Sequence, residues 1–244
     1  MHKRDKDHEM GEIHYPHFRF ASDQSILITL GQGISRDIHA EVYRLFHLLS
    51  STPIQGLRNI HPAYHTILIS YDPMATGAED IAGRIQSLIE HKDSFLLPHR
   101  RRVEIPVCYG ESWGPDLAYI AEHRQLTMEQ VIHSHSNREY LVYFLGFSPG
   151  FPYLGEMPME IAVPRLPPPR RHVPAGSVAI GGKQTGIYPV ASPGGWRIIG
   201  RTPKRLFFPD RYPPTLLQMG DIVCFTPISQ AEFLGIQKEE DFPA

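Results

Sequence analysis

The architecture of the second half of this chain follows from residues 173–201, which read VPAGSVAIGGKQTGIYPVASPGGWRIIGR. Short apolar runs alternate here with glycine and proline, two residues that helices tolerate poorly in their interiors. The pattern predicts three strands, over Ser177–Ile180, Gly186–Pro189 and Trp196–Gly200. Many short strands separated by turn residues are typical of a β-barrel or another compact all-β domain.

The residues around this stretch extend the same domain. Further elements are predicted from periodicity, namely strands over 101–110, Glu139–Phe147 and Asp221–Phe225 and helices over Pro115–His123 and Thr127–Ser134. In the second helix Thr127 and Gln130 have the spacing of a capping box. We predict a barrel domain over residues 101–236, followed by a flexible polar tail over 237–244.

The first part of the chain has a different composition. The whole chain has 23 prolines, and 18 of them lie at Pro106 or later, which indicates that the architecture changes near residue 100. Before that point the expected order is ββαββα, with strands over His17–Phe20, Ser25–Leu30, Leu57–Ile60 and Thr66–Tyr71 and helices over Arg36–Leu49 and Ala78–His91. This order predicts a small α/β sandwich over residues 17–100, after a flexible N-terminal extension over 1–16, and an α+β fold class for the whole chain.

Charge and composition exclude several function classes. The 24 Lys and Arg nearly balance the 26 Asp and Glu, which argues against holding nucleic acid by bulk neutralisation of phosphates. No apolar run approaches the roughly 20 residues of a membrane span, and no signal peptide is evident, so we expect a cytoplasmic protein without a membrane partner. The 14 histidines and two cysteines lack the spacing of metal ligands, and we predict no metal site.

Two segments match catalytic patterns only superficially. Residues 146–150 fit G-x-S-x-G, but a nucleophile elbow uses the N–H after the serine, and here that residue is Pro149. Residues 181–186 suggest a phosphate-binding loop, but Ser177 and Gln184 occupy positions where a Walker motif needs glycine and Ser or Thr. The glycine-rich segment remains open to two interpretations, an anion-binding loop or a tight turn between strands.

Other side chains suit a binding site. His135 precedes a predicted strand, where its imidazole can transfer protons if it faces a site. Five aromatic residues lie in segments rich in glycine and proline, as barrel core or as the rigid wall of a pocket: Phe147, Phe151, Tyr153, Tyr188 and Trp196. Arg197 and Arg201 are candidates for contacts with anions.

The same segments carry a family resemblance. Residues 145–155, LGFSPGFPYLG, resemble the GF-x-PGFPYLG motif of the family of 5-oxoprolinase B subunits, which also includes the kinase inhibitor KipI and allophanate hydrolase subunit 1. Residues 173–178, 184–189 and 192–203 match further marks of this family, in order. The resemblance runs from about Phe18 to Ile228.

This resemblance implies a ferredoxin-like N-terminal domain and a cyclophilin-like β-barrel. It also implies a tight pairing with the C subunit of 5-oxoprolinase and work with its A subunit, together opening the lactam of 5-oxoproline to glutamate at the expense of ATP, with Mg²⁺. Because they lie inside or beside the motifs, we predict His135 and Arg201 as catalytic residues. The predicted substrate-binding residues are Phe147, Phe151, Tyr153, Gln184, Tyr188, Trp196 and Arg197.

Two other functions fit the same resemblance. The chain is alternatively a regulator that binds a sensor histidine kinase, as KipI does, through its aromatic surface and without catalysis. It is alternatively half of a biotin-dependent carboxyltransferase acting on urea-type substrates. ATP turnover that requires the C subunit and 5-oxoproline distinguishes the first function from binding to a kinase alone and from dependence on biotin and urea.

Overall fold

The computed structural model describes residues 14–90 and 95–241 and divides the chain into two compact units. The first unit ends at Pro98 and the second begins at His99, two residues before the predicted boundary. Most of the predicted N-terminal extension, and the end of the second predicted helix at His91, lie outside the described residues.

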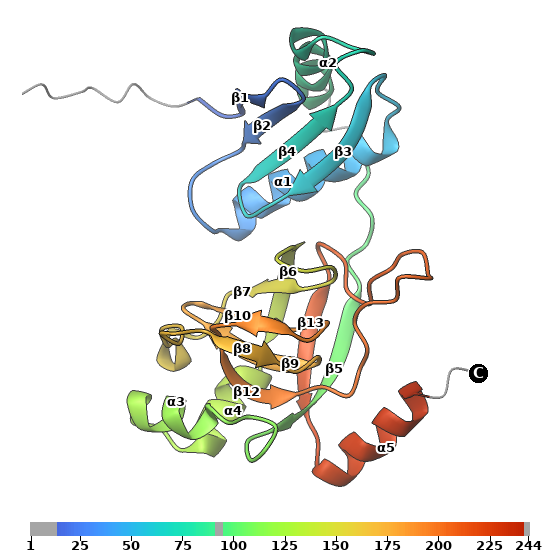
Figure 1. The fold of residues 1–244 in the computed structure, drawn as a ribbon. Coiled ribbons are helices and arrows are strands. Elements are labelled where there is room, and N and C mark those ends of the chain that lie inside the picture. Colours follow the sequence, from blue (N-terminus) through green and yellow to red (C-terminus); the bar gives the residue numbers. More distant parts are fainter. Residues whose placement is uncertain (1–13, 91–94, 242–244) are drawn as a thin grey trace, which may run out of the picture. The chain divides into compact units, whose positions relative to one another are not determined.

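The first unit has the predicted ββαββα order. Its elements are β1 (His17–Ser22), β2 (Ser25–Thr29), α1 (Arg36–Ser51), β3 (Leu57–Pro62), β4 (Thr66–Tyr71) and α2 (Ala78–Glu90) (Figure 1). The four strands form an antiparallel sheet in the order β1-β2-β4-β3. Alternate isoleucines of the central strands, such as Ile28 and Ile69, are fully buried, and both helices contact this sheet. The name ferredoxin-like stays a prediction.

The second unit contains a closed barrel. Its strands are β5 (Arg102–Tyr109), β6 (Glu139–Leu145), β7 (Pro152–Gly155), β8 (Arg170–Val173), β9 (Ser177–Gly181), β10 (Gln184–Ile187), β11 (Ser192–Gly194), β12 (Arg197–Arg201) and β13 (Ile222–Pro227). Its helices are α3 (Leu117–Arg124), α4 (Met128–Ser136), α5 (Gln230–Asp241) and the short 3-10 helix η2 (Met159–Ile161). Seven strands close in the order β10-β7-β6-β13-β5-β12-β9, consistent with a cyclophilin-like barrel.

The barrel closes through one parallel pairing, between β13 and β5; its other pairings are antiparallel. Its interior is filled by apolar side chains that alternate along each strand, such as Val178 and Ile180 of β9, both fully buried. Helices α3 and α4 pack together beside the barrel (Figure 1). Helix α4 begins with the predicted capping box, in which Thr127 and Gln130 bond at 2.8 and 3.2 Å.

The short strands β7, β8 and β11 were not predicted, because their prolines and glycines are also typical of loops. The C-terminal segment corrects another expectation: the predicted flexible tail from Gln237 is helical as far as Asp241. Helix α5 follows Ser229, which bonds Glu232 in a capping arrangement, and Phe233 anchors the helix on Trp113 with ring centroids 4.2 Å apart. No helix within residues 14–90 and 95–241 is both long and apolar enough to cross a membrane.

Candidate functional site

The structure gathers the five predicted aromatic residues into one cluster, which we call the aromatic layer: Phe147, Phe151, Tyr153, Tyr188 and Trp196. Phe151 is at its centre, with ring centroids 5.5, 5.1, 5.2 and 5.4 Å from those of Phe147, Tyr153, Tyr188 and Trp196. All of these contacts are edge-to-face, an arrangement that aromatic rings prefer. The layer lies on the opposite face of the barrel wall from the interior core, because side chains alternate along each strand.

The glycines of the sequence motifs make room for these rings. A Cβ atom on Gly181 would lie 2.5 Å from Cε2 of Trp196, and one on Gly194 would lie 2.2 Å from the hydroxyl oxygen of Tyr188. Both separations are far inside van der Waals contact, so a larger residue at either position displaces a ring. The glycine-rich segments therefore serve close packing of rings against the barrel wall.

Most of the aromatic layer is buried core. Phe151, Tyr188 and Trp196 are at most 5% exposed, and burial raises the pKa of the Tyr188 hydroxyl. Phe147 differs, because 63% of it is exposed and its φ of 65° is in the left-handed region that disfavours a phenylalanine. Of the layer, Phe147 is therefore the residue most accessible to a substrate or partner.

Two further predicted residues lie around the barrel wall without joining the layer's ring contacts. Gln184 begins β10, and its buried Nε2 has no hydrogen-bond partner among the described residues. The Arg197 guanidinium lies 3.7 Å above the Tyr119 ring and its Nη1 is 3.7 Å from Oδ1 of Asp116. Asp116 also accepts a 2.9 Å hydrogen bond from Arg170, so Arg197 belongs to a buried charge cluster.

His135 lies in the barrel core with its side chain fully buried, and its catalytic role stays a prediction. Its Nδ1 is 2.8 Å from the Tyr109 hydroxyl and its Nε2 is 2.9 Å from Oγ1 of Thr185, while its ring stacks on Phe225. It is fully buried, and burial lowers its pKa to about 3. Both ring nitrogens are therefore engaged with neighbouring hydroxyl groups, and burial keeps the ring neutral at pH 7.

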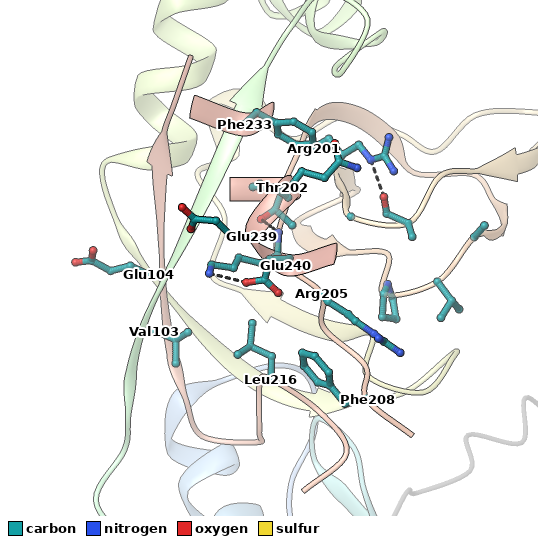
Figure 2. Close-up of a pocket in the computed structure, with 18 of the residues that line it drawn as sticks. Val103, Glu104, Arg201, Thr202, Arg205, Phe208, Leu216, Phe233, Glu239 and Glu240 are labelled. Carbon is teal, nitrogen blue, oxygen red and sulfur yellow. Dashed lines mark hydrogen bonds and ion pairs between the residues drawn. The ribbon is translucent and has the colours of Figure 1, made fainter. Parts of the chain in front are cut away.

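The second unit also has a large cavity, which we call the cationic cavity, with a volume of about 1150 Å³ (Figure 2). Three motif segments line it, through Ala175 and Gly176, through Pro189, and through residues 201–203, and Val190 and Ala191 lie between the last two segments. The remaining lining residues come from β5, from the segment between β12 and β13, and from α5: Val103, Glu104, Lys204, Arg205, Phe208, Arg211, Leu216, Phe233, Gln237, Glu239 and Glu240.

Arg201 is the one predicted site residue that lines this cavity. Its Nε donates a 2.7 Å hydrogen bond to the carbonyl oxygen of Ala175 (Figure 2). Its Cζ is 5.7 Å from the centroid of a Trp113 ring. Burial lowers the pKa of Arg201, although the group stays protonated at neutral pH. Among the described residues no carboxylate forms an ion pair with it, so its charge is available to an anion.

Sequence reasoning missed most of the charged residues of the cavity. The run RTPKR at 201–205 places three cations within five residues, a local signal that could have been used. Arg211 follows this run by six residues, whereas Glu239 and Glu240 of α5 are more than 30 residues away in sequence, and only folding brings them to the cavity. Among residues 14–90 and 95–241 no three His, Cys, Asp or Glu side chains are placed to hold a metal ion.

Comparisons with known proteins agree with this architecture. Residues 16–217 match the family model for the carboxyltransferase domain, subdomain C and D. The B subunit of 5-oxoprolinase from Bacillus subtilis (strain 168) is 40% identical over 233 residues, covering 90% of this chain and 95% of that protein. The protein of the same name from Escherichia coli O157:H7 is 43% identical over 210 residues, covering 84% and 93%.

A solved structure supports the fold. The crystal structure of TTHA0988 matches with a TM-score of 0.75 and 37% identity, over 84% of this chain. This chain spans 40% of the length of that solved protein. The alignment with the Bacillus subtilis protein covers nine-tenths of this chain, and the carboxyltransferase model covers most of this chain as well. The chain therefore belongs to the family of 5-oxoprolinase B subunits.

Proposed function

We propose that this chain is a subunit of an ATP-dependent 5-oxoprolinase, which opens the lactam ring of 5-oxoproline to glutamate. The observation that carries the proposal is the match to relatives named as B subunits of 5-oxoprolinase, over nearly the full length of both chains. That name implies a multi-subunit enzyme. We further propose the C and A subunits of 5-oxoprolinase as the partners, and no activity for this chain alone.

The side chains of the cationic cavity fit an anionic reactant. Arg201, Lys204, Arg205 and Arg211 supply guanidinium and ammonium groups, which pair with carboxylates and phosphates. ATP, bound with Mg²⁺ in the assembled complex, supplies the phosphoryl group that makes the lactam carbonyl reactive toward water. Stabilising charge during phosphoryl transfer needs positioned cations and not a protein nucleophile.

No described group acts as an activated nucleophile in the motif that superficially suggests one. Oγ of Ser148 is buried and has no hydrogen-bond partner among the described residues, so no base is placed to activate it. The next residue is Pro149, which has no N–H to stabilise an oxyanion. We therefore expect the chain to contribute binding and electrostatic stabilisation to the reaction. Because ATP is a reactant, the cytoplasm is the compartment that we propose for the chain.

The experiment that tests the proposal is ATP hydrolysis by the purified chain, alone and mixed with the C and A subunits, with and without 5-oxoproline. We expect turnover only in the complete mixture and only with 5-oxoproline. Absence of turnover in a mixture shown to assemble would overturn the proposal. Arg201→Ala is expected to lower turnover in the complete mixture without preventing assembly.

A second candidate function has one observation in its favour, namely that the matching family model describes a carboxyltransferase domain. In that case the assembled complex transfers a carboxyl group, and its activity requires biotin and a urea-type substrate. Assaying the same mixture with a biotin carrier and urea in place of 5-oxoproline separates the two. Inhibition of a histidine kinase also stays a prediction, tested by binding of this chain alone to such a kinase.

A further inference from the structure

We propose that the cationic cavity binds the phosphates and the ribose of a nucleoside triphosphate, so that this chain itself holds the nucleotide of the reaction. The inference rests on the proposed function for the identity of the reactant. It goes further by assigning the nucleotide to one subunit and to named residues.

The charges of the cavity leave three cations available. Four cationic side chains line it, but Nζ of Lys204 is already 2.7 Å from a carboxylate oxygen of Glu240. The guanidinium groups of Arg201, Arg205 and Arg211 form no ion pair with a carboxylate of the described residues. Three arginines without a carboxylate partner line one cavity, which suits a ligand with several negative charges, since guanidinium groups pair well with phosphate oxygens.

Two of these cations are positioned by an aromatic ring. Cζ of Arg205 lies 5.2 Å from the centroid of the Phe208 ring, and Cζ of Arg211 lies 4.6 Å from it. Nε of Arg205 also donates a 2.9 Å hydrogen bond to the carbonyl oxygen of Phe207. These contacts restrict the two side chains before any ligand arrives, which lowers the entropy lost on binding.

Two of the three acidic residues that line the cavity lie on its other side. Figure 2 shows Glu104 and Glu239 on the side opposite the guanidinium groups of Arg201 and Arg205. Glu104 is paired with Arg102, with N and O atoms 3.0 Å apart, whereas Glu239 is an exposed carboxylate on α5. A ligand that is anionic at one end and carries hydroxyl donors at the other matches this separation, because carboxylates accept hydrogen bonds from ribose hydroxyls.

The volume agrees with a ligand of this size. At about 1150 Å³ the cavity is slightly larger than the roughly 300–1,000 Å³ of typical small-molecule sites, and far larger than a phosphate ion or one 5-oxoproline molecule requires.

The test is calorimetric titration of ATP with Mg²⁺ into the purified full chain, without its partners. The double variant Arg205→Ala/Arg211→Ala removes two exposed cations, and Arg138→Ala removes an exposed arginine that does not line the cavity. We expect the wild type and Arg138→Ala to bind ATP equally, and the double variant at least about tenfold more weakly. Thermal unfolding of all three proteins verifies that they are folded.

The outcomes separate this inference from the proposed function. ATP turnover by the complete complex, without ATP binding to this chain, overturns the inference and leaves the function intact. Binding that the double variant retains also overturns it. Arginine-dependent binding without turnover supports the site and contradicts the function. Inorganic triphosphate is expected to bind more weakly than ATP, and equal affinity would overturn the assignment of a nucleoside.

Discussion

The aromatic layer and the cationic cavity are built from neighbouring residues and differ in their packing. Tyr188 and Trp196 are buried in the layer, while Pro189 and Arg201, which follow them closely in sequence, line the cavity. The layer consists of rings in mutual contact, with glycines beside them. The cavity, in contrast, is lined by arginines that form no ion pair with a carboxylate of the described residues. The same motif segments therefore contribute both to the packed layer and to the lining of the cavity that we propose as a binding site.

The largest effect is expected from removing the ring at the centre of the aromatic layer. Phe151 is only 2% exposed, so Phe151→Ala leaves a cavity where the ring was packed. We expect a loss of about 3–5 kcal/mol in the free energy of unfolding. Urea unfolding of the purified chain measures it. As the matched comparison, Arg205→Ala/Arg211→Ala is expected to stay within about 0.5 kcal/mol of the wild type. Equal losses in the two variants would show that the regions are not distinct.

A substitution of His135 tests whether the barrel core is separate from both the aromatic layer and the cationic cavity. Its pKa is about 3 in the folded chain and about 6.5 when unfolded, so as the pH falls the unfolded state takes up the proton first. The stability that depends on neutral His135 is fully present above about pH 6.5 and is lost as the pH falls toward 3. This loss amounts to about 2 kcal/mol in the free energy of unfolding between pH 7 and pH 5. Urea unfolding at both pH values should show that His135→Gln lacks this part of the loss. A parallel loss in both proteins, or weaker ATP binding in the variant, contradicts the assignment to the core.

Phe147 sharpens the boundary of the aromatic layer, because it is exposed and has a positive φ. Glycine adopts this conformation without strain, so Phe147→Gly should be more stable than Phe147→Ala by about 1 kcal/mol. Both variants should lower turnover of the assembled enzyme if the ring contacts a substrate or partner. Denaturant unfolding and the ATPase assay measure the two effects. Unchanged turnover in both variants would reduce Phe147 to a surface residue of the layer.

The smallest effect is expected at the ion pair beside the cavity. Glu240→Gln releases Lys204 from a partly exposed pair, which should lower the free energy of unfolding by less than about 1 kcal/mol. The released ammonium adds a cation to the cavity, and ATP affinity should rise by roughly two- to fivefold. Calorimetry on the full chain measures it. A weaker affinity would mean that Glu240 contributes to ligand binding directly.

Much of the fold follows from local sequence. The helices of the first unit and the capping box of α4 have the predicted positions, because apolar spacing and cap residues are local signals. Helix α5 also has such a signal, in the Ser229 and Glu232 pair, although the polar tail obscured it. The strands β7, β8 and β11 lack it, because their residues are those of turns and only pairing with distant strands makes them extended.

The candidate site was only partly accessible from sequence. The motifs were sufficient to select the five aromatic residues that pack together, and to select Arg201. They also selected His135, which the fold buries, and Arg197, which joins Asp116. The alternating pattern of a strand shows that successive residues lie on opposite faces of the sheet. It does not show which face packs against a core and which face lines a cavity.

The order of helices and strands in the first unit, the barrel of the second, and the family follow from local pattern and from ordered motifs, and so do the residue types available for chemistry. The tertiary structure decided which charges share a cavity. The parallel pairing of β13 with β5 and the anchoring of α5 through Phe233 bring Glu104 and Glu239 to the same cavity as Arg201. Such contacts join residues far apart in the chain, and no local pattern records them, since they depend on how whole elements pack.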